Sequence, residues 1–303
     1  MMSKEAAAHH SGFVALIGRS NVGKSTLLNR LIGQKIAITS NKPQTTRNRI
    51  LGILSRPDGQ VLFLDTPGLH AARSRLNKLM VEQAREACRE VDLILWLVEA
   101  DRPVDDEPLV ATALAQSGAP VVLVVNKCDL AGPTQLMPLL AAYGQLREFA
   151  AIVPVSALTG TGCDRLVDVI LAELPAGPRY YPDDQVTDLP ERFIAAELIR
   201  ERLLVHTRDE VPYGTAVVIE SFQEDPDRNL VVIQAVIHVE REMHKRMVVG
   251  KGGTMIRRIG QESRLAIEGL LGVRVFLELF VHVQSGWTSS DRALREFGYL
   301  GEK

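Results

Sequence analysis

The chain has 303 residues, enough for two domains, and its 46% hydrophobic and 24% charged residues exclude an extensively disordered protein. The formal net charge of −2 excludes a uniformly basic protein that coats nucleic acid, so any basic surface is expected to be local. The cysteine number is odd and no pair has CxxC spacing. These cysteines argue against a disulfide framework or a zinc site and favour a reducing compartment.

The N-terminal residues 1–11 lack the apolar stretch of a signal peptide and predict a flexible segment. The most apolar segments, such as VDLILWLVEA at 91–100, are shorter than the roughly 20 residues of a membrane-spanning helix. We therefore expect a soluble, cytoplasmic protein without a transmembrane segment.

Residues 12–174 alternate short apolar runs with helical stretches, which predicts an α/β domain. Several runs are apolar throughout, as expected where helices cover both faces of an open, mostly parallel sheet. Ligand sites in such a sheet lie at the carboxyl ends of the strands. The predicted strands are 13–18, 49–54, 60–65, 92–100, 120–126 and 151–157.

The first predicted strand is followed by GRSNVGKST, which matches the phosphate-binding pattern GxxxxGK[ST] and precedes a helical stretch. Glycines let backbone N–H groups surround a phosphate, and the helix N-terminus adds a favourable dipole. Lys24 is placed to reach the β- and γ-phosphates, and Ser25 to ligate Mg²⁺. The predicted nucleotide contacts in this loop are Gly18, Arg19, Ser20, Asn21, Val22, Gly23, Lys24, Ser25 and Thr26.

Between the first helical stretch and the second strand lies the polar segment TSNKPQTTRNR. We expect a switch here, ordered when Thr45 or Thr46 contacts Mg²⁺ and the γ-phosphate; the alternative is a solvated loop. Spacing alone does not separate the two threonines, and we place Thr46 in the magnesium set with Ser25 and Asp65.

The third predicted strand ends in DTPG, about 40 residues after the phosphate loop. The Asp65 carboxylate is expected to hold Mg²⁺ through a water, and the Gly68 N–H to contact the γ-phosphate. The predicted nucleotide contacts here are Asp65, Thr66, Pro67, Gly68 and Leu69.

Base recognition is assigned to NKCD at the end of the fifth strand. The Asp129 carboxylate can accept hydrogen bonds from the ring N–H and exocyclic amine of guanine, a donor pair that adenine lacks. Lys127 would pack over the ring, and Asn126 would fix the loop. The predicted contacts are Asn126, Lys127, Cys128 and Asp129, with Ser156 and Ala157 at the end of the sixth strand supplying a backbone N–H to the guanine oxygen.

Residues 175–190 contain four prolines and no apolar periodicity, which predicts a linker. Beyond it, 191–285 predicts an α+β domain, and 286–303 a C-terminal tail. This domain is expected to have an amphipathic helix at 191–207, strands at 213–223 and 229–241, helices on either side of GKGG, and a last strand at 273–284.

VVGKGGTMI matches the core pattern of a KH domain, whose GxxG loop brings the backbone close to about four nucleotides of single-stranded RNA. Glycines are needed because side chains would block that approach. Basic residues outnumber acidic ones from Arg241 to Arg264, so the positive charge is local. The predicted RNA contacts are Gly250, Lys251, Gly252, Gly253, Arg257 and Arg258.

GRSNVGKSTLLNRLIGQKIAITSNKPQTTR, DTPGLH and NKCD resemble the Era family of bacterial GTPases, and the resemblance spans nearly the whole chain. It implies a Ras-like P-loop G domain followed by a type II KH domain. It also implies a monomer that hydrolyses GTP to GDP and phosphate with Mg²⁺. The implied partners are the 3′ end of 16S rRNA and the 30S ribosomal subunit during its maturation, and DNA binding is not implied. Peripheral contact with the inner membrane is a further implication.

Signalling GTPases follow DTPG-type motifs with a glutamine that orients the attacking water, whereas this chain has Leu69. The family resemblance implies that Asn21 ligates a K⁺ ion and that switch backbone orients the water; His70 is an alternative water ligand. The catalytic candidates are Asn21, Lys24, Thr45, Thr46, Asp65 and Gly68. Two other functions stay open: an RNA-binding nucleotide sensor with weak hydrolysis, and a membrane-associated signalling GTPase.

Overall fold

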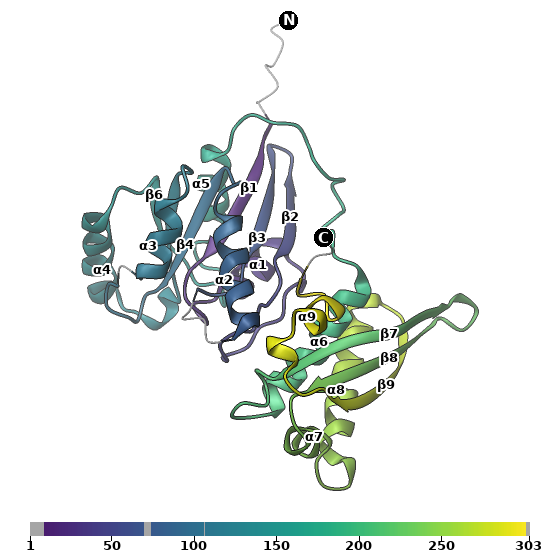
Figure 1. Cartoon of the computed structure of the whole chain (residues 1–303). Helices are drawn as coiled ribbons and strands as arrows, with labels where there is room; N and C mark the ends of the chain where they lie inside the picture. Colours follow the sequence, from purple (N-terminus) through teal and green to yellow (C-terminus); the bar gives the residue numbers. More distant parts are fainter. Residues whose placement is uncertain (1–8, 70–73, 106, 301–303) are drawn as a thin grey trace, which may run out of the picture. The chain divides into compact units, whose positions relative to one another are not determined.

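The computed structural model describes residues 9–69, 74–105 and 107–300 (Figure 1). Contacts divide the chain into two compact units, and the second unit takes in two short segments that precede it in sequence. The first unit comprises 1–37, 46–71 and 80–188, and the second comprises 38–45, 72–79 and 189–303.

The first unit is built on a six-stranded sheet with strand order β2-β3-β1-β4-β5-β6 (Figure 1). Only β2 is antiparallel to its neighbour, β3, so the sheet is mostly parallel as predicted. Every residue of β3 and β4 is buried, which explains why these strands are largely apolar; the polar residues Gln60, Asp65 and Glu99 are the exceptions. The strands are β1 His10–Ile17, β2 Ile50–Arg56, β3 Gly59–Asp65, β4 Leu93–Glu99, β5 Val121–Asn126 and β6 Ala151–Pro154.

Helices cover both faces of this sheet. One face packs against α2, α3 and α4 in a single apolar cluster that includes Ala15 and Ile17 of β1. Because side chains alternate along a strand, Val14 and Leu16 point to the opposite face, where α1 and α5 contact each other and the sheet. The helices are α1 Lys24–Ile32, α2 Arg75–Ala87, α3 Pro108–Ala115, α4 Pro133–Leu146 and α5 Cys163–Glu173.

The two ends of the first unit are joined to its sheet by hydrogen bonds. The strand β1 begins at His10, so the last two residues of the predicted flexible N-terminus belong to the sheet, whereas residues 1–8 lie outside the described part. The predicted linker also bonds to this unit. Ala176 forms a bridge with His10, and the Val186 carbonyl accepts from the N–H of Ile53 at 2.8 Å. The chain is therefore tied to the first unit as far as Asp188.

The second unit has the predicted α+β composition, with a three-stranded sheet in the order β7-β8-β9. The pair β7-β8 is antiparallel and β8-β9 is parallel. Helix α6 contacts α8 and β7, and α8 contacts β9, around one apolar core. The elements are α6 Glu191–His206, β7 Thr215–Asp225, β8 Leu230–Val239, α7 Glu242–Val249, α8 Thr254–Leu271, β9 Arg274–Val283 and α9 Asp291–Glu296.

The predicted tail packs on this unit around Trp287, which is fully buried. Its indole N–H donates to the Gly214 carbonyl at 3.0 Å, and its ring contacts those of Phe297 and Tyr299. Within the described ranges, no helix is long and apolar enough to cross a membrane.

Candidate functional site: a phosphate loop, a base loop and a glycine-lined groove

The loop between β1 and α1 has a backbone that requires glycine. Gly18 has φ 143° and Gly23 has φ 101°, values that L side chains rarely adopt. A Cβ on Gly18 would lie 2.5 Å from the Leu97 carbonyl oxygen, and one on Gly23 would lie 2.3 Å from Nδ2 of Asn126. Because α1 begins at Lys24, the loop ends at a helix N-terminus, the arrangement that binds phosphate.

Lys24 lies over the phosphate loop. Its Nζ donates to the carbonyls of Gly18 at 3.1 Å and Arg19 at 2.9 Å, and its side chain is buried. Burial lowers the pKa of Lys24, while the nearby carboxylates of Asp65 and Glu107 act in the opposite direction. The Lys24 amine therefore lies in the loop where phosphate oxygens would bind.

Three buried oxygens meet beside the loop. The Ser25 hydroxyl donates to Oδ2 of Asp65 at 2.6 Å and lies 2.8 Å from the Thr46 hydroxyl, which is 3.3 Å from the same carboxylate oxygen. The neighbouring Thr45 instead donates its hydroxyl to the Lys42 carbonyl at 2.7 Å. Of the two candidate threonines, the structure therefore brings Thr46, and not Thr45, to Ser25 and Asp65.

This oxygen cluster fits a hard divalent cation. Among the described atoms, Oδ1 of the buried Asp65 has no hydrogen-bond partner, and burial raises the pKa of this carboxyl while Lys24 opposes the rise. A buried carboxylate oxygen without a partner is costly. Mg²⁺ favours oxygen ligands, so Asp65, Ser25 and Thr46 are suitable residues to hold it.

The turn after Asp65 packs tightly against the phosphate loop. The Thr66 hydroxyl donates to the Leu16 carbonyl at 2.8 Å, and Pro67 is buried. A Cβ on Gly68 would lie 2.8 Å from Cα and N of Ser20. Only glycine therefore fits at this close approach of two backbones.

Leu69 belongs to the core. Its side chain is 5% exposed within the cluster that covers one sheet face, and its N–H donates to the Gly18 carbonyl at 3.2 Å. The alternative water ligand, His70, lies outside the described residues.

Asn126 joins the phosphate loop to the base loop. Its Nδ2 donates to the Val22 carbonyl at 2.8 Å, and its Oδ1 accepts from the Ala157 N–H at 3.0 Å. The side chain is 2% exposed. The neighbouring Ser156 uses its hydroxyl to accept from the Thr159 N–H at 3.1 Å, which fixes the turn after β6.

Other members of the base loop are positioned by residues that the sequence analysis missed. Lys127 has a left-handed φ of 62° and forms an ion pair with Glu99, the last residue of β4. Arg30 of α1 donates to the Ala157 carbonyl at 3.1 Å. The position of Glu99 at the carboxyl end of a sheet strand is the one signal that could have indicated it. Cys128 is half-buried and Asp129 is exposed.

An acidic pair lies near the phosphate loop. Arg19 forms an ion pair with Asp105 at 2.8 Å and lies 4.0 Å from Glu107. Glu107 is 8% exposed, and its burial raises its pKa to about 7. The Arg19 side chain is thus engaged with carboxylates, so a phosphate contact at this position falls to its backbone.

The GKGG loop of the second unit connects α7 to α8. Gly252 has φ 60° and Gly253 φ 76°, and nothing lies within 4 Å of a Cβ built on either. These positions combine a backbone that favours glycine with open space beside it. Gly250 and Lys251 complete the loop.

A groove of about 460 Å³ begins at this loop. It combines apolar side chains with two arginines, a suitable lining for a base and its phosphate. The predicted contact Arg257 lines it, whereas Arg258 does not and pairs with Glu262 at 3.0 Å. Sequence analysis missed Arg264. The lining residues are Gly253, Ile256, Arg257, Gly260, Gln261, Arg264, Leu277 and Leu279.

Both units have counterparts among known families. The family described as 50S ribosome-binding GTPase matches residues 13–127, and the KH domain family matches 210–288. The chain is 57% identical to GTPase Era of Geotalea uraniireducens over 290 residues, which are 95% of this chain and 97% of that protein. It is 56% identical to GTPase Era of Geobacter metallireducens, with the same coverage of both chains.

Two solved structures each match with a TM-score of 0.93. One is a variant of Aquifex aeolicus Era bound to GDP·AlF4⁻, 39% identical, covering 96% of this chain and 100% of that one. The other is Era in complex with MgGDPNP and nucleotides 1506–1542 of 16S ribosomal RNA, 40% identical, covering 97% of this chain and 100% of that one.

Proposed function

Because the chain belongs to the GTPase Era family, we propose that its first unit binds and hydrolyses GTP and its second unit binds the 3′ end region of 16S rRNA. Nucleotide state would control RNA binding during maturation of the 30S subunit. The observation that carries the proposal is the bridge made by Asn126, which links the phosphate loop at Val22 to the base loop at Ala157. One residue thus makes a triphosphate site and a purine site into a single nucleotide site.

Guanine selection is assigned to Asp129. A carboxylate at this position pairs with two donors on the purine edge, and an unpaired acceptor penalises adenine. Lys127, oriented by Glu99, would lie against the ring. The two N–H groups predicted to contact the guanine oxygen already have partners, because Ala157 donates to Oδ1 of Asn126 at 3.0 Å and Ser156 donates to the Thr161 carbonyl at 2.9 Å. The phosphate loop residues 18–26 would hold the phosphates through backbone N–H groups.

Hydrolysis is assigned to charge stabilisation at the phosphate loop. Mg²⁺ supplies Lewis-acid stabilisation of the β- and γ-phosphate oxygens when it is held by Asp65, Ser25 and Thr46. Lys24 neutralises charge on the same oxygens, and the Gly68 N–H contacts the γ-phosphate. Because Leu69 is buried and apolar, the backbone of the switch segment would orient the attacking water. Asn21 would hold a K⁺ ion that adds positive charge near the phosphates.

RNA binding is assigned to the GKGG loop and its groove. A related Era, 40% identical, has a structure with nucleotides 1506–1542 of 16S rRNA, so that RNA is the proposed ligand here. Gly252 and Gly253 leave space for the sugar-phosphate backbone, and Arg257 and Arg264 supply positive charge in the groove. The proposed place of action is the cytoplasm, with peripheral contact at the inner membrane.

The test of the nucleotide assignment is Asp129→Asn. An amide at this position offers a donor where the carboxylate offered an acceptor, so the variant should lose GDP affinity and gain affinity for the xanthine nucleotide. Unchanged GDP preference in this variant would remove Asp129 from base recognition. If Asn21 holds a K⁺ ion, GTP hydrolysis should be faster in K⁺ than in Na⁺. The Asn21→Ala variant should lose this difference in rate.

The test of the RNA assignment is Gly252→Asp, which adds a negative charge in a left-handed position beside the groove. We expect loss of binding to a 16S rRNA 3′ fragment with GTP binding unchanged. Retained RNA binding would favour the alternative in which the second unit is structural. Single-turnover hydrolysis with and without the RNA distinguishes a GTPase from a nucleotide sensor with weak hydrolysis.

A further inference from the structure

Residues 38–45, which precede the proposed magnesium ligand Thr46, belong to the second unit and pack on its helix α6. Ile38 is 2% exposed and lies in one apolar cluster with Ile194 and Leu198. The first residue of the segment is therefore anchored in the core of the second unit. The segment is thus not a freely solvated loop.

Two charged side chains fix the middle of the segment. Glu201 of α6, 2% exposed, accepts from the Thr39 N–H at 2.9 Å. Lys42 donates its Nζ to the carbonyls of Leu204 and Thr207 at the C-terminus of α6. A cation at a helix C-terminus is favourable because the last carbonyls are otherwise unpaired within the helix.

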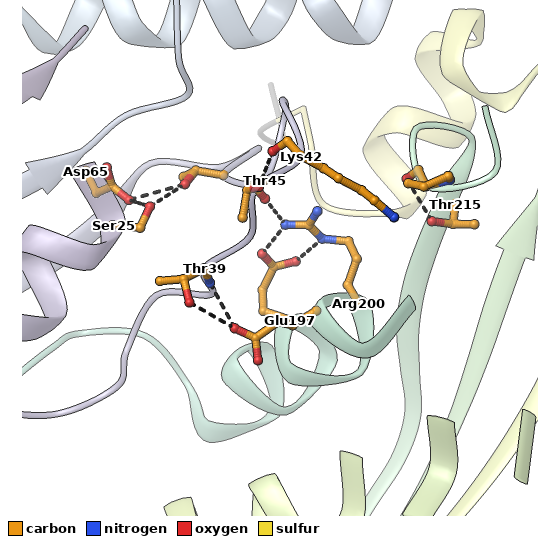
Figure 2. Close-up of polar contacts among 11 residues, drawn as sticks. Ser25, Thr39, Lys42, Thr45, Asp65, Glu197, Arg200 and Thr215 are labelled. Atoms are coloured by element: carbon orange, nitrogen blue, oxygen red, sulfur yellow. Dashed lines mark hydrogen bonds and ion pairs between the residues drawn. The ribbon is translucent and has the colours of Figure 1, made fainter. Parts of the chain in front are cut away.

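Arg200 holds the end of the segment. Its guanidinium is 1% exposed, donates to both carboxylate oxygens of Glu197, and donates through Nη2 to the Thr45 carbonyl (Figure 2). A buried arginine is stable only when it is paired and hydrogen-bonded. The rigid fork of the guanidinium therefore fixes the direction from which it binds the Thr45 oxygen.

The Thr45 carbonyl and the Thr46 nitrogen belong to one planar peptide unit. Fixing the Thr45 oxygen therefore fixes the peptide plane from which Thr46 projects. The Thr46 hydroxyl lies 2.8 Å from the Ser25 hydroxyl and 3.3 Å from Oδ2 of Asp65.

We propose that Arg200 is a positioning residue of the GTPase, which orients Thr46 for its contact with Mg²⁺ and the γ-phosphate by holding the Thr45 carbonyl. This inference rests on the proposed function and assigns to the second unit a residue that acts on nucleotide binding. Since a switch threonine makes this contact only with a triphosphate, Arg200 supports binding of GTP and leaves binding of GDP unaffected.

The experiment measures affinities of the full chain for a fluorescent non-hydrolysable GTP analogue and for fluorescent GDP, both with Mg²⁺. In Arg200→Gln we expect the ratio of GTP-analogue to GDP affinity to fall roughly tenfold, the effect of losing a charge-assisted hydrogen bond. Arg192→Gln is the matched control, because Arg192 lies on the same helix and donates to the Ile219 carbonyl, outside the switch segment. Its ratio should stay at the wild-type value.

A double-mutant cycle with Thr46→Ala tests whether Arg200 acts through Thr46. We expect Arg200→Gln to lower the affinity ratio in the wild-type background and to leave it unchanged once Thr46 is alanine. If Arg200→Gln does not fold, Arg200→Lys keeps the buried positive charge without the fork, and its ratio should fall by a smaller factor. An unchanged ratio in the folded variant, or additive effects in the cycle, overturns the inference.

The same measurement distinguishes this failure from failure of the proposed function. A wild-type protein that binds neither guanine nucleotide refutes the proposed GTPase. If the wild-type protein binds both nucleotides and the Arg200 variant keeps the same ratio of GTP-analogue to GDP affinity, only the positioning role is refuted. Arg200 then remains a stabilising residue of the second unit.

Discussion

Replacing Asn126 with alanine removes the side chain that joins the phosphate loop to the base loop. The Val22 carbonyl and the Ala157 N–H then lose their partners at 2.8 and 3.0 Å, in a site where Asn126 itself is 2% exposed. An unsatisfied buried group costs about 1–3 kcal/mol, so two predict a loss of about 2–6 kcal/mol in the free energy of unfolding of the first unit.

The assay is thermal unfolding of the full chain without nucleotide, together with GDP affinity. For a unit of this size, each kcal/mol lowers Tm by about 2–4 °C, so we expect the first transition to fall by at least about 4 °C. GDP affinity should also fall, because both loops lose their common support. Gln135→Ala on α4 is the control, since Gln135 is exposed and its loss should leave Tm nearly unchanged. If Asn126→Ala unfolds at the same Tm as the control, the two hydrogen bonds of Asn126 do not stabilise the first unit and the reasoning is refuted.

Three further predictions follow from burial near the nucleotide site. Glu107 binds its proton more tightly in the folded state, with its pKa raised from 4.5 to about 7, so the free energy of unfolding should fall by up to about 3 kcal/mol as pH rises through this window. Denaturant titrations should show this slope in the wild type and not in Glu107→Gln. Gly68→Ala should lower GTP-analogue affinity, measured by fluorescence titration, because its Cβ would meet Ser20 at 2.8 Å; wild-type affinity would contradict the close approach. Cys128 should react with a thiol reagent faster than Cys88, whose burial raises its pKa to about 11, and GDP should slow the reaction; equal rates would contradict this.

The nucleotide site could be predicted because its chemistry is encoded at short range. The phosphate loop contains Gly18, Gly23 and Lys24 within seven consecutive residues. Because the positive φ at the two glycines favours glycine, this backbone can be recognised from the sequence pattern. All six strands of the first unit were predicted for a similar reason, since a sheet covered on both faces needs apolar runs. Element boundaries were less accurate, as the start of β1 at His10 shows.

The supporting residues could not be predicted, because their partners are distant in sequence and follow no period. Glu99 reaches Lys127 across 28 positions, and Arg200 reaches Thr45 across 155. On an amphipathic helix, a charged residue such as Arg200 is expected to face solvent, and nothing local indicates that it is buried against an earlier segment. Arg258 was predicted to contact RNA but does not line the groove. Adjacent arginines on a helix point in different directions, so of this pair Arg257 lines the groove and Arg258 pairs with Glu262.

Leu69 stands where signalling GTPases have a glutamine, and its side chain lies in the apolar core. Because this side chain fills the apolar cluster over one sheet face, a polar residue in the same orientation would be buried without a partner. The first unit therefore uses position 69 for packing, and its N–H holds the phosphate loop at Gly18. Under the proposed function, orienting the water would fall to the backbone of the switch segment, where the Arg200 guanidinium donates to the Thr45 carbonyl.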